Sequence, residues 1–219
     1  MEINRDFYLS KLIKRKHNGL IKIITGIRRC GKSYLLNSIF YQHLLSSGID
    51  KKHIIRFAFD SADDLFMIGE SLVQMEKEKR GVDPEKFVAY IRSAVTDNGM
   101  YYLLLDEVQL MDCFESVLNG YLRKENMDVF VTGSNAKFLS KDIITEFAGR
   151  GDEIRMYPLS FAEFMSVYPG DKYILDSQSI CFMADFLWLY CRIIPGIKKW
   201  FCRIFSKKST SETLLKDAV

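Results

Sequence analysis

Residues Gly26 to Ser33 read GIRRCGKS, which matches the pattern GxxxxGK[ST]. The stretch follows a short apolar run, Leu20–Thr25 (LIKIIT), and precedes a segment whose apolar residues recur at helical intervals as far as Ser47. A glycine-rich turn between a strand and a helix directs consecutive backbone N–H groups at phosphate oxygens, and the helix N-terminus adds a favourable potential. The motif therefore predicts a phosphate-binding loop between a first strand and its crossover helix.

The residue types in this loop fit nucleotide chemistry. Lys32 supplies a flexible positive charge for the β- and γ-phosphates, and the Ser33 hydroxyl is expected to ligate Mg²⁺. Arg28 and Arg29 are expected either to touch phosphate or a partner, or to be solvated. For Cys30 we expect sensitivity to thiol reagents rather than a catalytic role. The residues that we predict to contact the nucleotide are Gly26, Ile27, Arg28, Arg29, Cys30, Gly31, Lys32, Ser33 and Tyr34.

A second apolar run ends in two acids, at Leu103–Glu107 (LLLDE). Ligands of open parallel sheets bind beyond the carboxyl ends of the strands, so these carboxylates are predicted to lie at the binding edge. Asp106 is expected to hold Mg²⁺ through water, and Glu107 to orient and deprotonate the attacking water. A solvated turn is the alternative. The acidic pair and the lack of an NKxD guanine-reading motif in the sequence favour ATP hydrolysis over a kinase or GTPase.

Two later segments carry further polar residues. Val131–Asn135 (VTGSN) follows another apolar run, and either Ser134 or Asn135 is predicted to lie near the γ-phosphate, although Gly-Ser-Asn is also ordinary turn chemistry. Gly149–Gly151 (GRG) precedes the last apolar run. Arg150 is predicted to reach the γ-phosphate of a neighbouring subunit, with a plain exposed loop arginine as the alternative.

Apolar runs alternate with helical patterns along the chain, which is typical of a parallel sheet with crossover helices. Asp83 and Asp112 are expected to cap helices at their N-termini, and Ser160 with Glu163 forms a predicted capping box. The chain is therefore predicted to be α/β. The predicted strands are Leu20–Thr25, Ile54–Phe59, Tyr101–Leu105, Val129–Thr132 and Ile154–Tyr157.

The composition sets broad limits on the class of protein. The 219 residues suit one domain, or one domain with an appendage, and the formal net charge of +3 is too small to imply nucleic-acid binding by bulk charge. A local basic patch is left open. Five cysteines without CxxC pairing fit a reducing compartment better than a disulfide framework. The first residues contain no apolar leader. We therefore expect a cytoplasmic protein that does not enter the membrane.

The order of these motifs resembles that of the AAA+ superfamily. More narrowly, ITGIRRCGKSYLL, LLLDEVQ, VTGSNAKFLS and AGR…YPLSFAEF resemble a prokaryotic AAA+ ATPase family whose members continue into a C-terminal domain of unknown role. The resemblance spans Ile3 to Val167. It implies a P-loop three-layer sandwich with a five-stranded parallel sheet in the order 5-1-4-3-2 and helices on both faces. It also implies the roles given above for Lys32, Ser33, Asp106, Glu107, Ser134 or Asn135, and Arg150.

The resemblance implies a Mg²⁺-dependent ATPase module. The alternative is a nucleotide-dependent switch that binds ATP and a partner with little turnover. The expected partners are ATP, further copies of the chain contacted through Arg150, and an unidentified protein. Nucleic-acid binding rests on analogy alone.

The similarity ends after Tyr173. Residues 1–167 are expected to form the ATPase domain, and residues 168–219 to be a poorly ordered tail that does not match the family. One alternative for the tail is a membrane span at Ile180–Ile197. Asp185 and Arg192 interrupt that run, however, and a charge at mid-bilayer costs about 2.5–3.5 kcal/mol on insertion scales.

Back-translation of the tail gives a more specific hypothesis. In a shifted reading frame, each new codon takes the third base of one codon and the first two bases of the next. In that frame Phe182–Trp188 can spell Tyr-Gly-Gly-Leu-Pro-Leu, a motif like the one that family members carry next. The stretch Arg203–Asp217 also permits a family-like string. The hypothesis is a chain truncated relative to the family by a frameshift near Leu175. Genomic DNA that lacks a family-like continuation in the shifted frame would contradict it.

Overall fold

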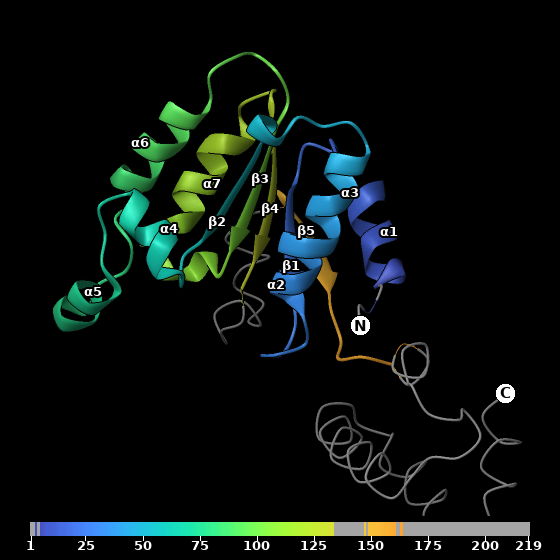
Figure 1. Ribbon diagram of the computed structural model, residues 1–219, viewed down its shortest axis with the longest axis horizontal. Coiled ribbons are helices and arrows are strands. Elements are labelled where there is room, and N and C mark those ends of the chain that lie inside the picture. The colour runs from blue at the N-terminus through green and yellow to red at the C-terminus, as the bar shows by residue number, and fades with distance from the viewer. Residues whose placement is uncertain (1–2, 4, 134–146, 148, 161–162, 164–219) are drawn as a thin grey trace, which may run out of the picture. The chain divides into compact units, whose positions relative to one another are not determined.

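The computed structural model describes residues 3, 5–133, 147, 149–160 and 163, all within one compact unit spanning residues 2–163. The central sheet has five parallel strands in the order β2-β3-β4-β1-β5 (Figure 1). This is the predicted order 5-1-4-3-2 read from the other edge, so the predicted fold is confirmed. The strands are β1 (Ile21–Thr25), β2 (Ile54–Ala58), β3 (Tyr101–Asp106), β4 (Met127–Thr132) and β5 (Gly151–Arg155).

Helices cover both faces of the sheet. On one face lie α4 (Ala62–Met67), α6 (Pro84–Ala94) and α7 (Phe114–Leu122) (Figure 1). Between α4 and α6 in the chain comes α5 (Leu72–Glu78), which lies beyond α4. On the other face, α1 (Asp6–Lys14) packs beside a continuous helical segment formed by α2 (Lys32–Tyr34), the π-helical η1 (Leu35–Phe40) and α3 (Tyr41–Ser46). Short 3₁₀ turns form η2 (Lys51–His53) and η3 (Val108–Leu110).

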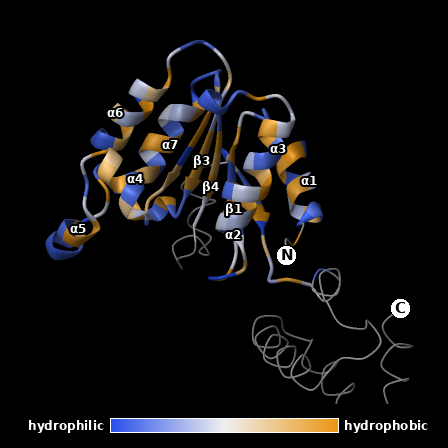
Figure 2. Ribbon diagram, in the orientation of Figure 1, coloured by the Kyte–Doolittle hydropathy of each residue, from blue (hydrophilic) through white to orange (hydrophobic). Residues whose placement is uncertain are grey.

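The strand β3 shows why the sheet is central. All six of its residues are buried, as its uninterrupted apolar sequence predicts. Tyr101, Leu103 and Leu105 pack in the core beneath α6 and α7, whereas Tyr102 and Leu104 pack in the core beneath α1 and the α2–η1–α3 segment. The hydropathy colouring shows mostly apolar strands between helices of mixed hydropathy (Figure 2). Among the described residues, none of the helices combines the length and apolar character that crossing a bilayer requires.

One position within the apolar strand β1 holds a charged residue. Lys22 of β1 is fully buried, and its ammonium donates to the carbonyl of Leu20 at 2.8 Å and to the Asp128 carboxylate of β4. Burial lowers the pKa of Lys22, whereas the bond and charge of Asp128 oppose that shift. Removing one partner of such a buried pair destabilises a fold much more than replacing both by apolar residues.

The last strand begins earlier than predicted. We expected Ile154–Tyr157, but β5 spans Gly151–Arg155 and pairs with β1 from Gly151 opposite Ile21. Only Ile154 of β5 is buried, because β5 is the edge strand of the sheet and its other side chains lie in partly polar surroundings. Apolar content therefore understates the length of this strand.

The predicted cap at Asp112 is wrong. The N-cap of α7 is Cys113, in a left-handed conformation and without a side-chain cap. The Asp112 carboxylate instead accepts the backbone N–H of Gly81 at 3.1 Å. This bond joins the connection between α5 and α6 to the loop before α7. A distant backbone donor, invisible to local sequence reasoning, competes successfully for this carboxylate.

The other two predicted caps are confirmed. Asp83 accepts the N–H of Glu85 at 2.8 Å at the start of α6. The backbone N–H of Glu163 donates to the Ser160 hydroxyl at 3.2 Å, and the N–H of Ser160 donates back to the Glu163 carboxylate at 2.7 Å. These reciprocal bonds are those of a capping box. The expectations for residues 168–219, including the span at Ile180–Ile197, lie outside the described residues.

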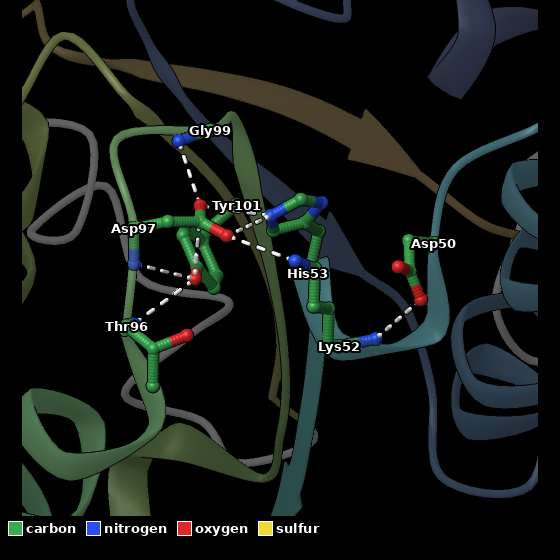
Figure 3. A network of polar contacts seen from close by, with 7 residues as sticks. All are labelled: Asp50, Lys52, His53, Thr96, Asp97, Gly99 and Tyr101. Atoms are coloured by element: carbon green, nitrogen blue, oxygen red, sulfur yellow. Dashed lines mark hydrogen bonds and ion pairs between the residues drawn. The ribbon is translucent and has the colours of Figure 1, made fainter.

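At the amino ends of β2 and β3, one carboxylate joins two loops. Asp97 accepts the N–H of Gly99 at 2.8 Å, the imidazole of His53 at 2.9 Å and the ammonium of Lys52 at 3.0 Å, and the Tyr101 hydroxyl lies 3.3 Å away (Figure 3). The Gly99 N–H, followed by Lys52 and His53, holds the pKa of Asp97 well below its usual range. This network links the amino ends of β2 and β3, whereas the phosphate-binding loop follows the carboxyl end of β1.

Candidate nucleotide-binding site

The predicted phosphate-binding loop leaves β1 at Thr25 and enters α2 at Lys32. Gly26 has a φ of 151°, and a Cβ at this position would lie 2.4 Å from the carbonyl oxygen of Met156. Gly31 has a φ of 93°. Both the backbone conformation and the close approach of the segment after β5 therefore require glycine at the start of the loop.

Lys32 lies inside the curve of the loop. Its side chain is almost completely buried, and its ammonium donates to the carbonyls of Gly26 and Ile27 at 3.1 Å each. Arg28 and Arg29 are exposed, and Tyr34 is 40% exposed. The loop thus holds one cation at its centre and two at its surface, which is the arrangement expected if Lys32 meets the phosphates.

Sequence reasoning missed a buried arginine that anchors the loop. The Arg5 guanidinium donates to the carbonyl of Cys30 at 3.3 Å and to that of Tyr157 at 2.6 Å, and it lies 3.0 Å from the Glu163 carboxylate. The loop is therefore tied to the segment after β5. Burial raises the pKa of the Cys30 thiol, which opposes the reactivity toward thiol reagents that we expected of it.

Asp106 is the best-connected acid of the site. Its carboxylate is buried at the carboxyl end of β3, where it accepts hydrogen bonds from the hydroxyls of Ser33 and Thr132. Its other oxygen accepts the side-chain N–H of Asn37 at 3.2 Å. Side chains from the loop helix and from β4 thus meet on the carboxylate that we predicted to bind metal, and the Ser33 hydroxyl is one of them.

The electrostatics of this carboxylate favour a cation. Burial, assisted by the charges of Glu107 and Asp60, raises the pKa of Asp106, while the hydroxyls of Thr132 and Ser33 lower it. The largest contributions come from burial, neighbouring hydroxyls and neighbouring acids, and none of the ion pairs among the described residues involves Asp106. A carboxylate and hydroxyl oxygens are ligands suited to Mg²⁺, which usually takes its remaining ligands from water and substrate phosphates. The residues present therefore fit the predicted ion.

Glu107 leaves the strand at a sharp bend. Its backbone is left-handed, with a φ of 53°, and its N–H donates to the Thr132 hydroxyl oxygen at 3.1 Å. The side-chain amide of Gln109 donates to the Glu107 carboxylate. The carboxylates of the two neighbouring acids therefore lie in different surroundings, since Asp106 is buried at the end of β3 and Glu107 is partly exposed beyond it.

Thr132, the last residue of β4, is a site residue that sequence reasoning passed over. The signal was present, because VTGSN was recognised as polar after an apolar strand, and the pairing of Leu105 with Val131 places Thr132 beside Asp106. Ser134 and Asn135, which we predicted instead, lie outside the described residues.

Arg150 lies away from the loop of its own chain. It directly precedes β5, and its carbonyl accepts the N–H of Ile21 at the amino end of β1. The phosphate-binding loop follows the carboxyl end of that same strand. The exposed Arg150 side chain contacts Asn119 of α7 at 3.4 Å. Arg150 is therefore not part of the same-chain site.

Comparison with protein families gives a match to a model described as "AAA domain" over residues 18–165. An uncharacterized protein of Haemophilus influenzae is 34% identical over 178 residues, which cover 81% of this chain and 40% of that protein. An uncharacterized protein of Methanocaldococcus jannaschii is 30% identical over 167 residues, covering 74% and 31%. The chain thus spans well under half the length of these relatives.

Comparison with solved structures gives matches at low sequence identity. AMPPCP-bound DnaA from Aquifex aeolicus has a TM-score of 0.48 at 17% identity, over 84% of this chain and 56% of that one. Cdc6p from Pyrobaculum aerophilum has a TM-score of 0.47 at 14% identity, over 75% and 48%.

Replacing Asp106 by asparagine should raise the melting temperature of the metal-free protein at pH 7. Because the folded-state pKa of Asp106 is raised, its ionised form disfavours folding above that pKa, and the penalty disappears as the pH falls toward the unfolded value of about 3.9. The advantage of Asp106→Asn should therefore shrink between pH 7 and pH 4. Asp63→Asn, in an exposed acid of α4, is the control. A lower melting temperature for Asp106→Asn at pH 7 would contradict this account.

Proposed function

Because the chain belongs to the AAA domain family, within the AAA+ superfamily, we propose that it binds ATP with Mg²⁺ and hydrolyses it. The observation that carries this proposal is the meeting of Ser33 with Asp106. These residues come from the loop helix and from β3, which are far apart in sequence, and they bring a hydroxyl and a buried carboxylate together beside Lys32. Such a set of oxygens next to a phosphate-binding loop suits a metal–nucleotide complex.

Each residue then has a defined task. Backbone N–H groups of the glycine-rich loop and the Lys32 ammonium bind the phosphates, so Lys32 exchanges its bonds to the loop carbonyls for bonds to phosphate oxygens. Ser33 and Asp106 would hold Mg²⁺, which when bound neutralises charge on the phosphate oxygens. Glu107 orients a water molecule and accepts its proton as that water attacks the γ-phosphorus. Either Ser134 or Asn135 contacts the γ-phosphate.

Arg150 acts in the site of a second copy of the chain. It lies at the amino ends of strands β1 and β5, whereas the loop of its own chain lies at the carboxyl end of β1. Only a neighbouring molecule can therefore present a γ-phosphate to it. An arginine supplied in this way stabilises charge in the transition state. The proposed active form is therefore an oligomer, with ATP bound between subunits.

Glu107→Gln should retain ATP binding and lose hydrolysis, because glutamine keeps the shape of the side chain but cannot accept the proton. Binding is measured as the shift in melting temperature with Mg-ATP, which corresponds to about 2.7 kcal/mol at roughly 100 times Kd. Hydrolysis is measured as phosphate release. Lys32→Ala is the binding control and should show no shift relative to its own melting temperature. Normal hydrolysis by Glu107→Gln would refute the assigned base. If the wild-type protein shows the thermal shift with Mg-ATP but releases no phosphate, a nucleotide-dependent switch is favoured instead.

Arg150→Ala should lower phosphate release by about 10³-fold or more while leaving the Mg-ATP thermal shift intact. Mixing it with Lys32→Ala subunits should restore part of the activity, because the intact loop of an Arg150→Ala subunit can then meet the intact Arg150 of a Lys32→Ala neighbour. Neither variant alone should be active. Full activity of Arg150→Ala, or no recovery in the mixture, would contradict the intermolecular role.

A further inference from the structure

A single hydroxyl joins the two acids of the site. The Thr132 hydroxyl donates to one oxygen of Asp106 and accepts the backbone N–H of Glu107 at 3.1 Å. Thr132 is completely buried. Because the hydroxyl has one proton and accepts through its lone pairs, these two contacts use it as donor and acceptor at once. The carboxylate assigned to metal and the residue assigned as base thus share one support.

The sheet register fixes this hydroxyl in space. Thr132 is paired with Ile24 of β1 on one side, and the residue before it, Val131, is paired with Leu105 of β3 on the other. It therefore stands between the strand that carries the phosphate-binding loop and the strand that carries the acids. Threonine is β-branched and has few χ1 rotamers, so a buried strand position holds its hydroxyl in one direction.

The second oxygen of Asp106 has its own neutral donor. Asn37 donates its side-chain N–H at 3.2 Å from the π-helical segment η1, four residues after Ser33. The amide oxygen of Asn37 is buried and has no hydrogen-bond partner in the described part of the chain. Both carboxylate oxygens thus accept hydrogen bonds from uncharged groups, and the described residues form no ion pair with Asp106.

We propose that Thr132 is a positioning residue for ATP hydrolysis, which orients Asp106 for Mg²⁺ and fixes the backbone from which Glu107 acts. This inference rests on the proposed function. It assigns a role to a residue that acts through two hydrogen bonds, one to each of the two acids. Partners of metal-binding groups typically change metal affinity or activity by 10–100-fold when they are lost.

The test compares Thr132→Val, which keeps the shape but lacks the hydroxyl, with Thr132→Ser, which keeps the hydroxyl. Thr132→Val should lower kcat by about 10–100-fold and raise the Mg²⁺ concentration for half-maximal hydrolysis. Its thermal shift with ATP in EDTA should match that of the wild type, which also shows that it is folded. Thr132→Ser should stay close to the wild type in all three measurements.

Thr25→Val is the matched control. Thr25 is also a buried threonine at the carboxyl end of a strand, but its hydroxyl donates to Glu153 at 2.5 Å rather than to the acids of the site. This variant should keep the Mg²⁺ dependence of the wild type.

A wild-type kcat and Mg²⁺ dependence in Thr132→Val would overturn the inference while leaving the ATPase proposal intact. So would equal losses in Thr132→Ser and Thr132→Val, since packing rather than the hydroxyl would then be responsible. A wild-type protein that neither binds nor hydrolyses ATP would overturn both.

Discussion

The buried carboxylate of Asp106 is the constraint on which the rest of the site depends. An ionised group removed from water is unfavourable unless hydrogen bonds or a counter-charge replace its hydration. Here the replacement comes from Ser33, Asn37 and Thr132, which reach Asp106 from the loop helix and from β4. These donors can converge only if β3, β4 and β1 lie side by side with their carboxyl ends at one edge. The sheet order is therefore a requirement of the site and not only a way of burying apolar surface.

Much of this architecture could be predicted from sequence, because its strongest signals are local. The buried strands β1 and β3 are mostly apolar, and each was predicted to within one residue of its observed ends. The loop motif and the acids at Asp106 and Glu107 follow directly from residue type and order. The match to the AAA domain family confirms the resemblance that these motifs suggested. Their chemical roles stay predictions.

What sequence reasoning could not supply depends on contacts between distant segments. The role of Thr132 follows from strand register, and Arg5 reaches the loop from a helix start 25 residues before Cys30. Asp112 binds a backbone donor 31 residues away instead of capping its own helix. The edge strand β5 has little apolar character, so its first residues gave no signal. In each case the deciding partner is chosen by tertiary packing, and nearby residues do not reveal it.

The π-helical segment Leu35–Phe40 has a consequence for how the chain can change in length. A π turn closes each hydrogen bond over five residues instead of four, so the α-helical turns before and after it are offset as if one residue had been inserted. Upstream, this register places Lys32 against the loop carbonyls and Ser33 beside Asp106; downstream, it packs Leu44 in the core. Losing a single residue here would rotate one half by about 100° relative to the other. One alignment would then be lost, so substitutions should be tolerated in this segment more readily than deletions.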